Sequence, residues 1–435
     1  MMVQAWSTVV SVSVDLLAAA GIAYVLLAIF HVRRFRELAH AHGQYRPAIS
    51  VMKPLCGGEP RLYECLRSFV DQEYPDFQIV FGVREASDPA VSVVARLRAE
   101  FPDRDITLVV DARIHGPNLK VSNLLNMLPA CRHDVLVVAD SDVRVGRQAL
   151  ATVVDSLENP RVGAVSCLYK GVPAAGHAAR LGGLFINDWF LPSALVDEAL
   201  NGVDGCFGPM IALRRRALAE AGGFEALVDY LAEDNRLGRL VRRAGWEVRL
   251  SHHAVETMVE EADLRGLISH EVRWGRTVRA CRAADHALSV ITFPLPLLLV
   301  PLFLVPTSLT LVLVSAYVGL RVVLHQVVRR RFVLSASPFS PWLVPVRECL
   351  CFAVWAVSLL GQRVTWRGRV YRITAEGRLI PTVRGLDSYR WYQARAASER
   401  NPLRTKSKLR ADGMVSETSL ETGSACQEPA TAVVE

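Results

Sequence analysis

The chain has 435 residues, of which 51% are hydrophobic, with a mean hydropathy of +0.23 and a formal net charge of +7. This length leaves room for one large domain with appendages, and the apolar excess indicates membrane segments. The basic residues cluster beside apolar runs without interleaved aromatic residues, which argues against a nucleic-acid partner and favours contact with anionic lipid headgroups.

The first predicted element is a transmembrane helix within residues 1–34. Its apolar run is interrupted only by Asp15, and residues 16–32 are long enough to cross a hydrocarbon core of roughly 30 Å. A signal peptide is the alternative, but no small-residue cleavage site is evident, and three arginines follow the run instead of preceding it. Because basic residues favour the cytosolic side, the amino terminus is expected to face out.

A domain of alternating strands and helices is predicted over residues 46–283. Apolar runs and turn signals indicate strands at 48–55, 77–83, 106–110, 134–139 and 162–168, with helices at 62–71, 89–100, 120–128 and after Gly146. This alternation predicts an α/β domain with a mostly parallel sheet, which binds nucleotides at the carboxyl ends of its strands. Nine cysteines without a Cys-x-x-Cys pair indicate reduced thiols in a cytosolic domain.

Lys53-Pro54 and Asp88 follow the first two predicted strands, and Lys120 opens a predicted helix. At Lys53-Pro54 the backbone has room to approach a nucleotide base. Asp88 precedes a proline, so it is either a helix cap or a hydrogen-bond acceptor for a uracil ring or a ribose. Lys120 is either solvated surface or a ligand of a diphosphate. We assign all four residues to the candidate nucleotide-sugar site.

Two carboxylates directly follow the apolar run 134–139. Asp140 and Asp142 flank a single serine where a buried strand is expected to end. Such an oxygen-rich pair suits a divalent cation, Mg2+ or Mn2+, and the phosphates that the cation neutralises. Solvated loop carboxylates are the alternative. Together with the other polar motifs of the domain, the pair indicates an enzyme that handles nucleotide-activated sugars.

Glu233 and Asp234 stand at the expected amino terminus of a helix, because apolar residues recur at helical spacing after them. Asp234 is either a cap or a general base held at the mouth of the sheet. Transfer of a sugar with inversion requires a carboxylate opposite the leaving diphosphate, where it takes the proton of the attacking hydroxyl. Asp234 is therefore the candidate base, and Glu233 a candidate for acceptor or donor specificity.

His270 opens a third motif, which ends in Arg273-Trp274 just before the second apolar block. An Arg beside a Trp at the edge of a bilayer is a common interfacial anchor. In combination with the acidic motifs a second role is expected, in which Arg273 holds the diphosphate and Trp274 forms a wall of the acceptor pocket.

Two more apolar blocks and a polar tail follow. Residues 287–325 contain four prolines between basic flanks, which predicts a membrane hairpin bent near Pro306, with one long tilted helix as the alternative. Residues 341–375 carry two charges near their start and are expected to cross the membrane, re-enter it or lie in its interface. Residues 396–435 are polar and expected to be disordered.

Taken in order, these motifs resemble the ceramide glucosyltransferase family, including bacterial relatives that glycosylate hopanoid lipids. The family pattern is three separated aspartates, then Gln or Arg, two variable residues and Arg-Trp, and it matches Asp88, Asp140, Asp234 and Arg273-Trp274. Further matching segments are Ser50-Val-Met-Lys-Pro-Leu, Gly116-Pro-Asn-Leu-Lys-Val-Ser-Asn-Leu, Val346-Arg-Glu and Thr365-Trp-Arg-Gly-Arg-Val-Tyr-Arg372.

The resemblance implies a membrane-bound domain of the GT-A fold, a UDP-sugar donor, a lipid acceptor and Asp234 as the proton acceptor. His270 stands where the family has Gln or Arg, so its contact, and with it the preferred sugar, stays open. The segment Gly205-Cys-Phe-Gly-Pro-Met-Ile also departs from the family pattern and is expected to border the acceptor. The composition, rich in Arg and Ala, favours a bacterial protein of the inner membrane.

We therefore expect an inverting, cation-dependent glycosyltransferase with a cytosolic catalytic domain. It would move one sugar, glucose or N-acetylglucosamine, from UDP to the hydroxyl of a ceramide-type lipid. Transfer of N-acetylglucosamine to a hopanoid polyol is the first alternative. A processive polysaccharide synthase would need more spanning helices, and an inactive membrane scaffold would need no base at Asp234.

Overall fold

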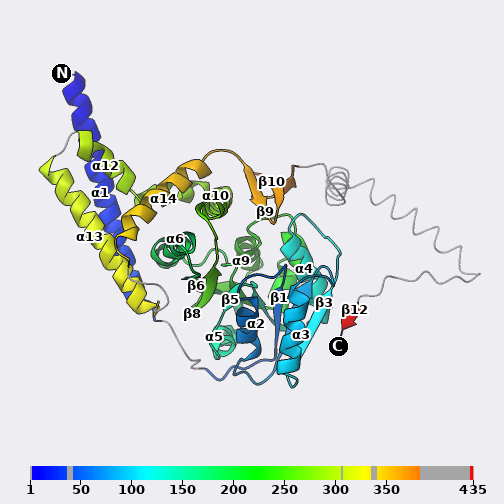
Figure 1. Ribbon diagram of the computed structural model, residues 1–435. Coiled ribbons are helices and arrows are strands. Elements are labelled where there is room, and N and C mark those ends of the chain that lie inside the picture. The colour runs from blue at the N-terminus through cyan, green and yellow to red at the C-terminus, as the bar shows by residue number, and fades with distance from the viewer. Residues whose placement is uncertain (1, 37–42, 305–306, 335–339, 383–431, 435) are drawn as a thin grey trace, which may run out of the picture.

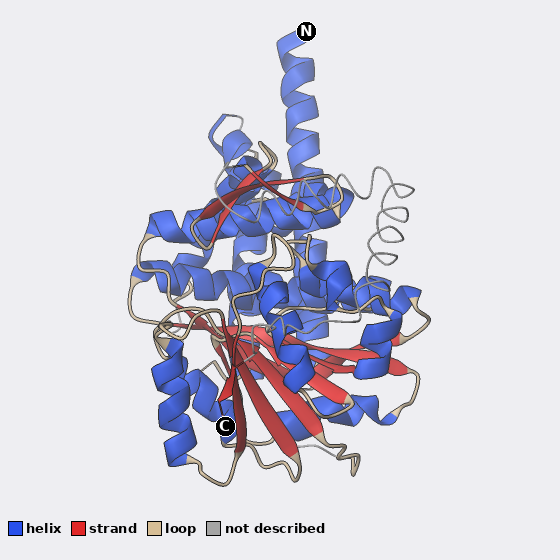
Figure 2. Ribbon diagram, turned by 90° about the vertical axis from the view of Figure 1, so that its right-hand side faces the viewer, coloured by secondary structure: helices blue, strands red, loops and turns tan. Residues whose placement is uncertain are grey.

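The computed structural model describes five stretches of the chain, residues 2–36, 43–304, 307–334, 340–382 and 432–434. A large sheet with helices on both faces forms the body of the protein, and a group of long helices leans against one side of it (Figure 1). Figure 2 shows a layer of helices between this large sheet and a second, small one. The protein is thus built from a sheet domain, a helical group and a small sheet.

The large sheet has nine strands in the order β12-β3-β2-β1-β4-β7-β6-β8-β5. Its parallel half consists of β3 (Asp105–Val110), β2 (Phe77–Val83), β1 (Ile49–Pro54) and β4 (Val135–Ala139). The antiparallel β7 (Met210–Arg214) joins β4 to a second parallel pair, β6 (Val162–Pro173) and β8 (Glu247–Val259). The short edge strands β5 (Val143–Arg144) and β12 (Ala432–Val434) are antiparallel to their neighbours.

Successive residues of the central strands contribute to two separate cores, as the two-residue period of a strand requires. Val51 of β1 packs with helices α2, α3 and α5, whereas its neighbour Met52 packs with α4, α8 and α9. The bounds of these helices are Leu62–Val70, Ala90–Glu100, Ala149–Asp155, Leu119–Met127, Arg215–Glu220 and Glu233–Arg243. Both faces of the sheet are therefore covered, which explains why its central strands read as uninterrupted apolar runs.

The predicted fold class, an α/β domain with a mostly parallel sheet and apolar helices near both ends, is confirmed. Four strands of this sheet, β5, β7, β8 and β12, were not expected from the sequence. The antiparallel β5, β7 and β12 make the sheet mixed. The strand β6 extends five residues beyond its predicted end at 168, because it pairs with β8 as far as Pro173.

A helical layer follows β6 and β8 and lies over the carboxyl side of the sheet (Figure 2). It contains α6 (His177–Phe185), the π-helix η3 (Ile186–Phe190) and α7 (Leu191–Asn201), together with α10 (Leu264–Cys281) and α11 (Ala283–Leu288). Short 3-10 turns occur at Leu128–Ala130, Ser156–Glu158, Phe224–Leu227 and Ser289–Thr292.

Two helices of the described residues are long and apolar enough to cross a membrane. They are α1 (Met2–Arg34), through its stretch Val12–Arg34, and α13 (Ser308–Arg331). The two pack along each other (Figure 1). Asp15, the charge that interrupts the first apolar run, accepts a 3.1 Å hydrogen bond from Thr310 Oγ1 of α13.

The second apolar block forms two helices of unequal length. The helix α12 (Leu295–Leu304) has 10 residues and is therefore only about 15 Å long, whereas α13 continues to Arg331. The predicted bend at Pro306 lies between them, at a residue outside the described stretches. Arg321, a basic flank in the sequence reading, is instead buried within α13, because the helix continues past it.

The two charges of the third block are buried in ion pairs. This block forms α14 (Leu343–Ser358), in which Arg347 lies 2.8 Å from Glu271 of α10. Glu348 faces Arg321 of α13 at 3.6 Å and accepts hydrogen bonds from Tyr317 and from the Leu295 amide. Pairing offsets much of the cost of removing these charges from water.

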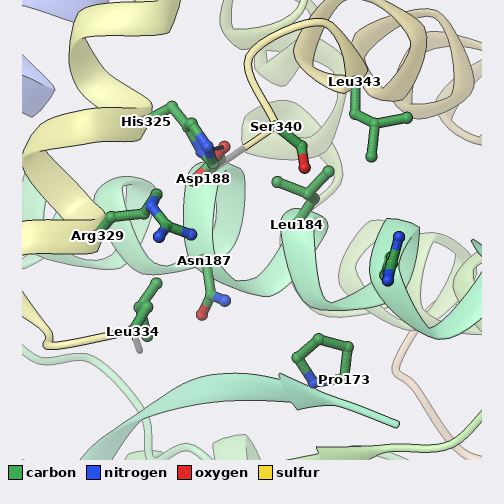
Figure 3. A pocket seen from close by; sticks show the side chains of 10 residues that line it. Pro173, Leu184, Asn187, Asp188, His325, Arg329, Leu334, Ser340 and Leu343 are labelled. Atoms are coloured by element: carbon green, nitrogen blue, oxygen red, sulfur yellow. Dashed lines mark hydrogen bonds and ion pairs between the residues drawn. The ribbon is translucent and has the colours of Figure 1, made fainter. Parts of the chain in front are cut away.

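A third buried pair joins α13 to the π-helix. Asp188 Oδ2 and His325 Nδ1 are 2.7 Å apart, and Figure 3 shows them side by side at a cavity between the two elements. The Arg321 guanidinium stacks over the ring of Trp189 at 3.9 Å. The long helix and the domain are therefore connected by polar contacts as well as by apolar packing.

After α14, the predicted segment 341–375 continues into strands, and its membrane or interfacial position stays a prediction. These strands form most of the small sheet of β9 (Arg363–Trp366), β10 (Arg369–Ile373) and β11 (Leu379–Pro381). This sheet packs its apolar face on Leu231, ahead of α9. The predicted disordered tail, 396–435, lies outside the described residues except for β12.

Candidate active site

The ends of β4 and β1 and the start of α9 meet at one side of the large sheet, and they bring two of the predicted aspartates together. Asp140 follows β4, and its amide donates a 3.1 Å hydrogen bond to the Pro209 carbonyl. A Cβ atom on the adjacent Gly208 would lie 3.0 Å from Asp234 Oδ2 and 3.6 Å from Asp140 Oδ2. Asp140 and Asp234 therefore flank the same glycine and share one acidic site.

Lys120 links these two acidic segments. Its ammonium lies 2.5 Å from Asp140 Oδ1 and 2.9 Å from Glu233 Oε1. Asn118, the cap of α4, accepts a hydrogen bond from the Val121 amide and donates one to Glu233 at 3.2 Å. Burial lowers the pKa of Lys120, but the carboxylates outweigh burial and raise it. The lysine is thus a fixed cation at the site.

Asp142 lies beside a glutamate that the sequence reading did not select. Glu59, in the loop between β1 and α2, accepts a 2.5 Å hydrogen bond from Ser141 Oγ. Burial raises the pKa of Asp142 to about 7, and the charges of Asp140 and Glu59 add to this rise. The Asp-Ser-Asp sequence therefore carries an excess of negative charge that a bound cation would relieve.

Lys53 is fully buried beneath the site. Its ammonium donates a 2.7 Å hydrogen bond to the backbone carbonyl of Asp140 and lies 3.7 Å from the centre of the Phe69 ring. Burial lowers the pKa of Lys53 to about 8. This hydrogen bond therefore positions Asp140. Pro54, the half-buried last residue of β1, stays a predicted neighbour of the nucleotide base.

Asp88 lies one strand away from the acidic centre and performs the capping role. Its carboxylate accepts hydrogen bonds from the Ala90 amide at the start of α3 and from the Gly57 amide at 3.0 and 3.1 Å. Gly57 belongs to the same loop as Glu59, so Asp88 is linked to Ser141 through this loop. Its predicted contact with a uracil or a ribose stays a prediction.

The motif of α10 supplies a cation and an aromatic wall. Within the described part of the chain, the Arg273 guanidinium has no hydrogen-bond or ion-pair partner, and burial lowers its pKa to about 10 while Glu233 counteracts burial. His270 Nδ1 lies 2.6 Å from Glu261 Oε1, and its ring centre is 4.3 Å from that of Trp274. His270 is therefore fixed against Glu261.

An aromatic group adjoins the acidic centre. Tyr169 of β6 stacks on Phe190 of the π-helix at 4.3 Å, and Phe207 meets Phe190 edge-on at 5.2 Å. Burial raises the pKa of Tyr169, and the charges of Asp234, Asp142 and Asp140 raise it further. The phenol is thus close enough to the three aspartates for their charges to act on it.

Asp234 has the properties of a general base. Its Oδ1 accepts a 2.8 Å hydrogen bond from the Asn235 amide, whereas Oδ2 lies toward Gly208. Burial raises the pKa of Asp234 to about 7, Glu233 raises it further, and Lys120 opposes both. A carboxylate whose pKa lies near neutrality accepts a proton more readily than an ordinary aspartate.

The donor set of the site fits a divalent cation that is shared with a substrate. Among the described residues, no three His, Cys, Asp or Glu side chains are arranged to hold a metal by themselves. Mg2+ commonly takes one or two carboxylates and completes its shell with phosphate oxygens and water. Asp140 and Asp142 supply two such carboxylates, with negative charge in excess, so they would hold the cation.

Sequence reasoning missed Glu59, Asn118, Tyr169 and Arg367. Asn118 carried a signal, because it precedes a predicted helix as cap residues do. Glu59 carried none, and Arg367 was noted only within the family-matching segment 365–372, because the 2.9 Å ion pair between the two residues joins segments far apart in the chain. Tyr169 was not selected because the predicted strand ended at residue 168, one residue before it.

The chain is similar to known glycosyltransferases over the residues that carry these motifs. The model of glycosyl transferase family 21 matches residues 13–379. Ceramide glucosyltransferase 3 of Caenorhabditis elegans is 24% identical over 360 residues, which cover 77% of this chain and 74% of that protein. A ceramide glucosyltransferase of Pyricularia oryzae is also 24% identical, over 430 residues, covering 77% and 86%.

A mannosyltransferase from Pyrobaculum calidifontis, in complex with GDP-Man and Mn2+, gives a TM-score of 0.48 at 20% identity and covers 80% of this chain and 99% of that one. The family match spans most of the chain and includes every motif described above, which confirms the resemblance seen in the sequence. The chain therefore belongs to glycosyl transferase family 21 and is a glycosyltransferase.

Proposed function

We propose that this protein transfers one sugar from a UDP-sugar to the hydroxyl of a membrane lipid of the ceramide type, with inversion at the anomeric carbon. The observation that carries the proposal is that Asp140 Oδ2 and Asp234 Oδ2 both approach the same point beside Gly208. One carboxylate belongs to the predicted cation site and the other to the predicted base. The names of the family relatives support a lipid acceptor.

Asp234 would act on the acceptor. Its Oδ1 is fixed by the Asn235 amide, and Oδ2 is the oxygen positioned to accept the hydroxyl proton. As the proton leaves, the acceptor oxygen forms a bond to the anomeric carbon and the bond to the diphosphate breaks, so that the electron pair departs with UDP. Attack opposite the leaving group inverts the anomeric configuration.

Cationic side chains would stabilise the departing UDP. Lys120 is already held at the site, and Arg273 faces it without a partner among the described residues. Their charges offset the negative charge that develops on the diphosphate as the bond to the sugar breaks. A divalent cation at Asp140 and Asp142 would supply further stabilisation of the same charge.

The aromatic group suits an acceptor that approaches from the membrane. Tyr169 lies beside the aspartates, and its neighbour Phe190 belongs to the π-helix that contacts α13. A lipid hydroxyl could therefore reach Asp234 along an apolar wall. The two helices long enough to cross a membrane support placement at a bilayer, whereas a cytosolic site in a bacterial inner membrane stays a prediction.

The alternative acceptor is a hopanoid polyol with N-acetylglucosamine as the sugar. His270, which stands where the family pattern has Gln or Arg and is fixed 2.6 Å from Glu261, leaves the preferred sugar open. A changed side chain at this point alters the contacts available near Trp274. The two acceptors and two sugars can be compared directly in one assay.

Membranes containing the protein should convert labelled UDP-glucose or UDP-N-acetylglucosamine, offered with ceramide or a hopanoid polyol, into an extractable glycolipid with Mg2+ present. Asp234→Asn should abolish conversion while leaving expression intact. Asp105→Asn is the matched control, because Asp105 starts β3, at the amino end of a strand whereas the site lies at the carboxyl ends, and it pairs with an exposed arginine. Full activity of Asp234→Asn would refute the assignment of the base, and failure with every lipid would refute the function.

A further inference from the structure

The turn between β9 and β10 has a backbone that its sequence does not favour. Trp366 pairs with Arg369, so Arg367 and Gly368 form a two-residue connection, with φ angles of 48° and 74°. Such a turn prefers Asn-Gly, since asparagine tolerates positive φ better than most other residues. An arginine therefore occupies this tip in a backbone conformation that arginine does not favour, which points to a role for its side chain.

The Arg367 side chain extends to the Asp-Ser-Asp sequence. Its guanidinium lies 2.9 Å from Glu59 Oε1, while Glu59 Oε2 accepts the hydrogen bond from Ser141 Oγ. Arg367 is half exposed and Glu59 less so. The tip of the small sheet is therefore separated from the Asp-Ser-Asp sequence by a single side chain, the carboxylate of Glu59.

The base of the small sheet is anchored to two loops of the site. The Leu379 amide donates a 2.7 Å hydrogen bond to the Asp229 carbonyl, ahead of Glu233. Tyr371 Oη donates to the Pro117 carbonyl at 3.4 Å, ahead of Lys120. The sheet thus contacts the loops that lead to both ends of the acidic cluster, and only the tip is free to exchange partners.

Charge balance indicates which partner the tip would take. Five carboxylates line the site, those of Glu59, Asp140, Asp142, Glu233 and Asp234, and a nucleoside diphosphate would add further negative charge. The Lys53 ammonium is bonded to a backbone carbonyl beneath the site, and Lys120 already pairs with two carboxylates, so Lys120 can offset only part of this charge. Among the described residues of this rim, Arg273 has no ion-pair partner, and Arg367 is a half-exposed cation that can exchange its pair with Glu59.

We propose that Arg367 is a donor-binding residue whose guanidinium leaves Glu59 and pairs with the diphosphate of the bound nucleotide sugar, an inference that rests on the proposed function. An arginine fork matches two phosphate oxygens at once, which a lysine does not. The small sheet then forms one side of the donor site, and its tip lies over the diphosphate.

The test measures binding of UDP and of uridine to the purified full-length protein in detergent, with Mg2+ present. Arg367→Asn is the informative variant, because asparagine suits the turn and the hairpin should fold at least as well. Loss of a charge-assisted contact should weaken UDP binding by roughly tenfold or more and leave uridine binding unchanged. Arg372→Gln, an exposed arginine of β10, is the control and should bind UDP like the wild type.

Glu59→Gln separates ligand binding from a structural ion pair. If Arg367 serves the diphosphate, removal of its competing partner should leave UDP binding as tight as in the wild type or make it tighter. A purely structural pair would make Glu59→Gln and Arg367→Asn equally weak. Equal weakening in these two variants would overturn the inference. So would unchanged UDP binding in Arg367→Asn, or a loss of uridine binding as large as the loss of UDP binding.

The same measurements distinguish this inference from the proposed function. UDP binding requires neither an acceptor nor transfer, so a wild-type protein that binds UDP but glycosylates no lipid refutes the function while Arg367 is still judged by its effect on UDP. A wild-type protein that binds no UDP refutes the proposed donor and the role of Arg367 together. Thermal unfolding of each variant confirms that the compared proteins are folded.

Discussion

The ammonium of Lys53 and the backbone carbonyl of Asp140 are joined by a hydrogen bond of 2.7 Å inside the domain. The lysine is fully buried, and its other neighbour is the face of the Phe69 ring. The first carboxylate of the Asp-Ser-Asp sequence is therefore held from beneath by a charged group. This contact explains how a lysine near the carboxyl end of β1 influences the site without reaching its surface.

Replacing Lys53 with methionine should weaken both the fold and the site. The methionine fills a similar volume but removes the shorter of two hydrogen bonds to the Asp140 carbonyl, which the Val143 amide also reaches at 3.3 Å. Loss of a hydrogen bond from a charged donor costs about 1.5–3 kcal/mol. We expect a lower unfolding temperature in detergent and a lower kcat, with the donor KM also raised. Lys53→Arg, which keeps a donor, is the comparison variant. Wild-type kcat in a folded Lys53→Met protein would contradict the positioning role.

The pH dependence of transfer should show the raised pKa of Asp234. A general base works only when deprotonated, so kcat should fall as the pH drops through about 7 and reach a plateau above that value. Glu233→Gln removes a charge that raises the pKa of Asp234, and it should move this fall to lower pH. The measurement is kcat against pH at saturating substrates. A shift to higher pH in Glu233→Gln would reverse the predicted sign.

Breaking the buried pair between α13 and α14 should destabilise the helical group. Arg321→Met leaves Glu348 buried without its counter-charge, which typically costs about 3–5 kcal/mol. Adding Glu348→Gln should restore much of the stability, because an amide oxygen can still accept the hydrogen bonds of Tyr317 and Leu295. Thermal unfolding in detergent of both single variants and the double variant checks this. Equal stability of Arg321→Met and the double variant would show no coupling.

Asp88→Asn separates the two roles of that residue. The amide oxygen can still accept from Ala90, whereas one of the two contacts with Gly57 is lost, so the unfolding free energy should fall by only about 0.5–1 kcal/mol. If the carboxylate binds a uracil or a ribose, the donor KM should also rise several-fold. Unchanged KM would leave Asp88 as a cap alone.

The parallel half of the sheet could be predicted from the sequence because its strands are buried on both faces. The predicted strand at 77–83 matches β2, and the predictions at 48–55 and 134–139 differ from β1 and β4 by one or two residues. The antiparallel β7 and the long β8 were missed, since polar residues such as Glu247 and His252 interrupt the apolar pattern of β8. Tertiary pairing defines these strands more than their own composition does.

The site was predictable where one segment carries several polar groups, and obscure where contact joins distant segments. Asp140 and Asp234 were selected from their places at a strand end and a helix start, and the structure brings them together at Gly208. Glu59 stands in a loop whose sequence has no pattern of its own. Its role depends on Ser141 and Arg367, which lie far along the chain and could not be paired with it from the sequence.

The contact between His325 of α13 and Asp188 of the π-helix has a consequence for how the bilayer acts on the enzyme. A helix adjusts its tilt to the thickness of the hydrocarbon around it. Asp188 is two residues from Phe190, whose ring stacks on Tyr169 beside the carboxylates. A change in the inclination of α13 would therefore act on the π-helix through this pair and on Tyr169 through Phe190, which couples the position of the helix to the acidic centre.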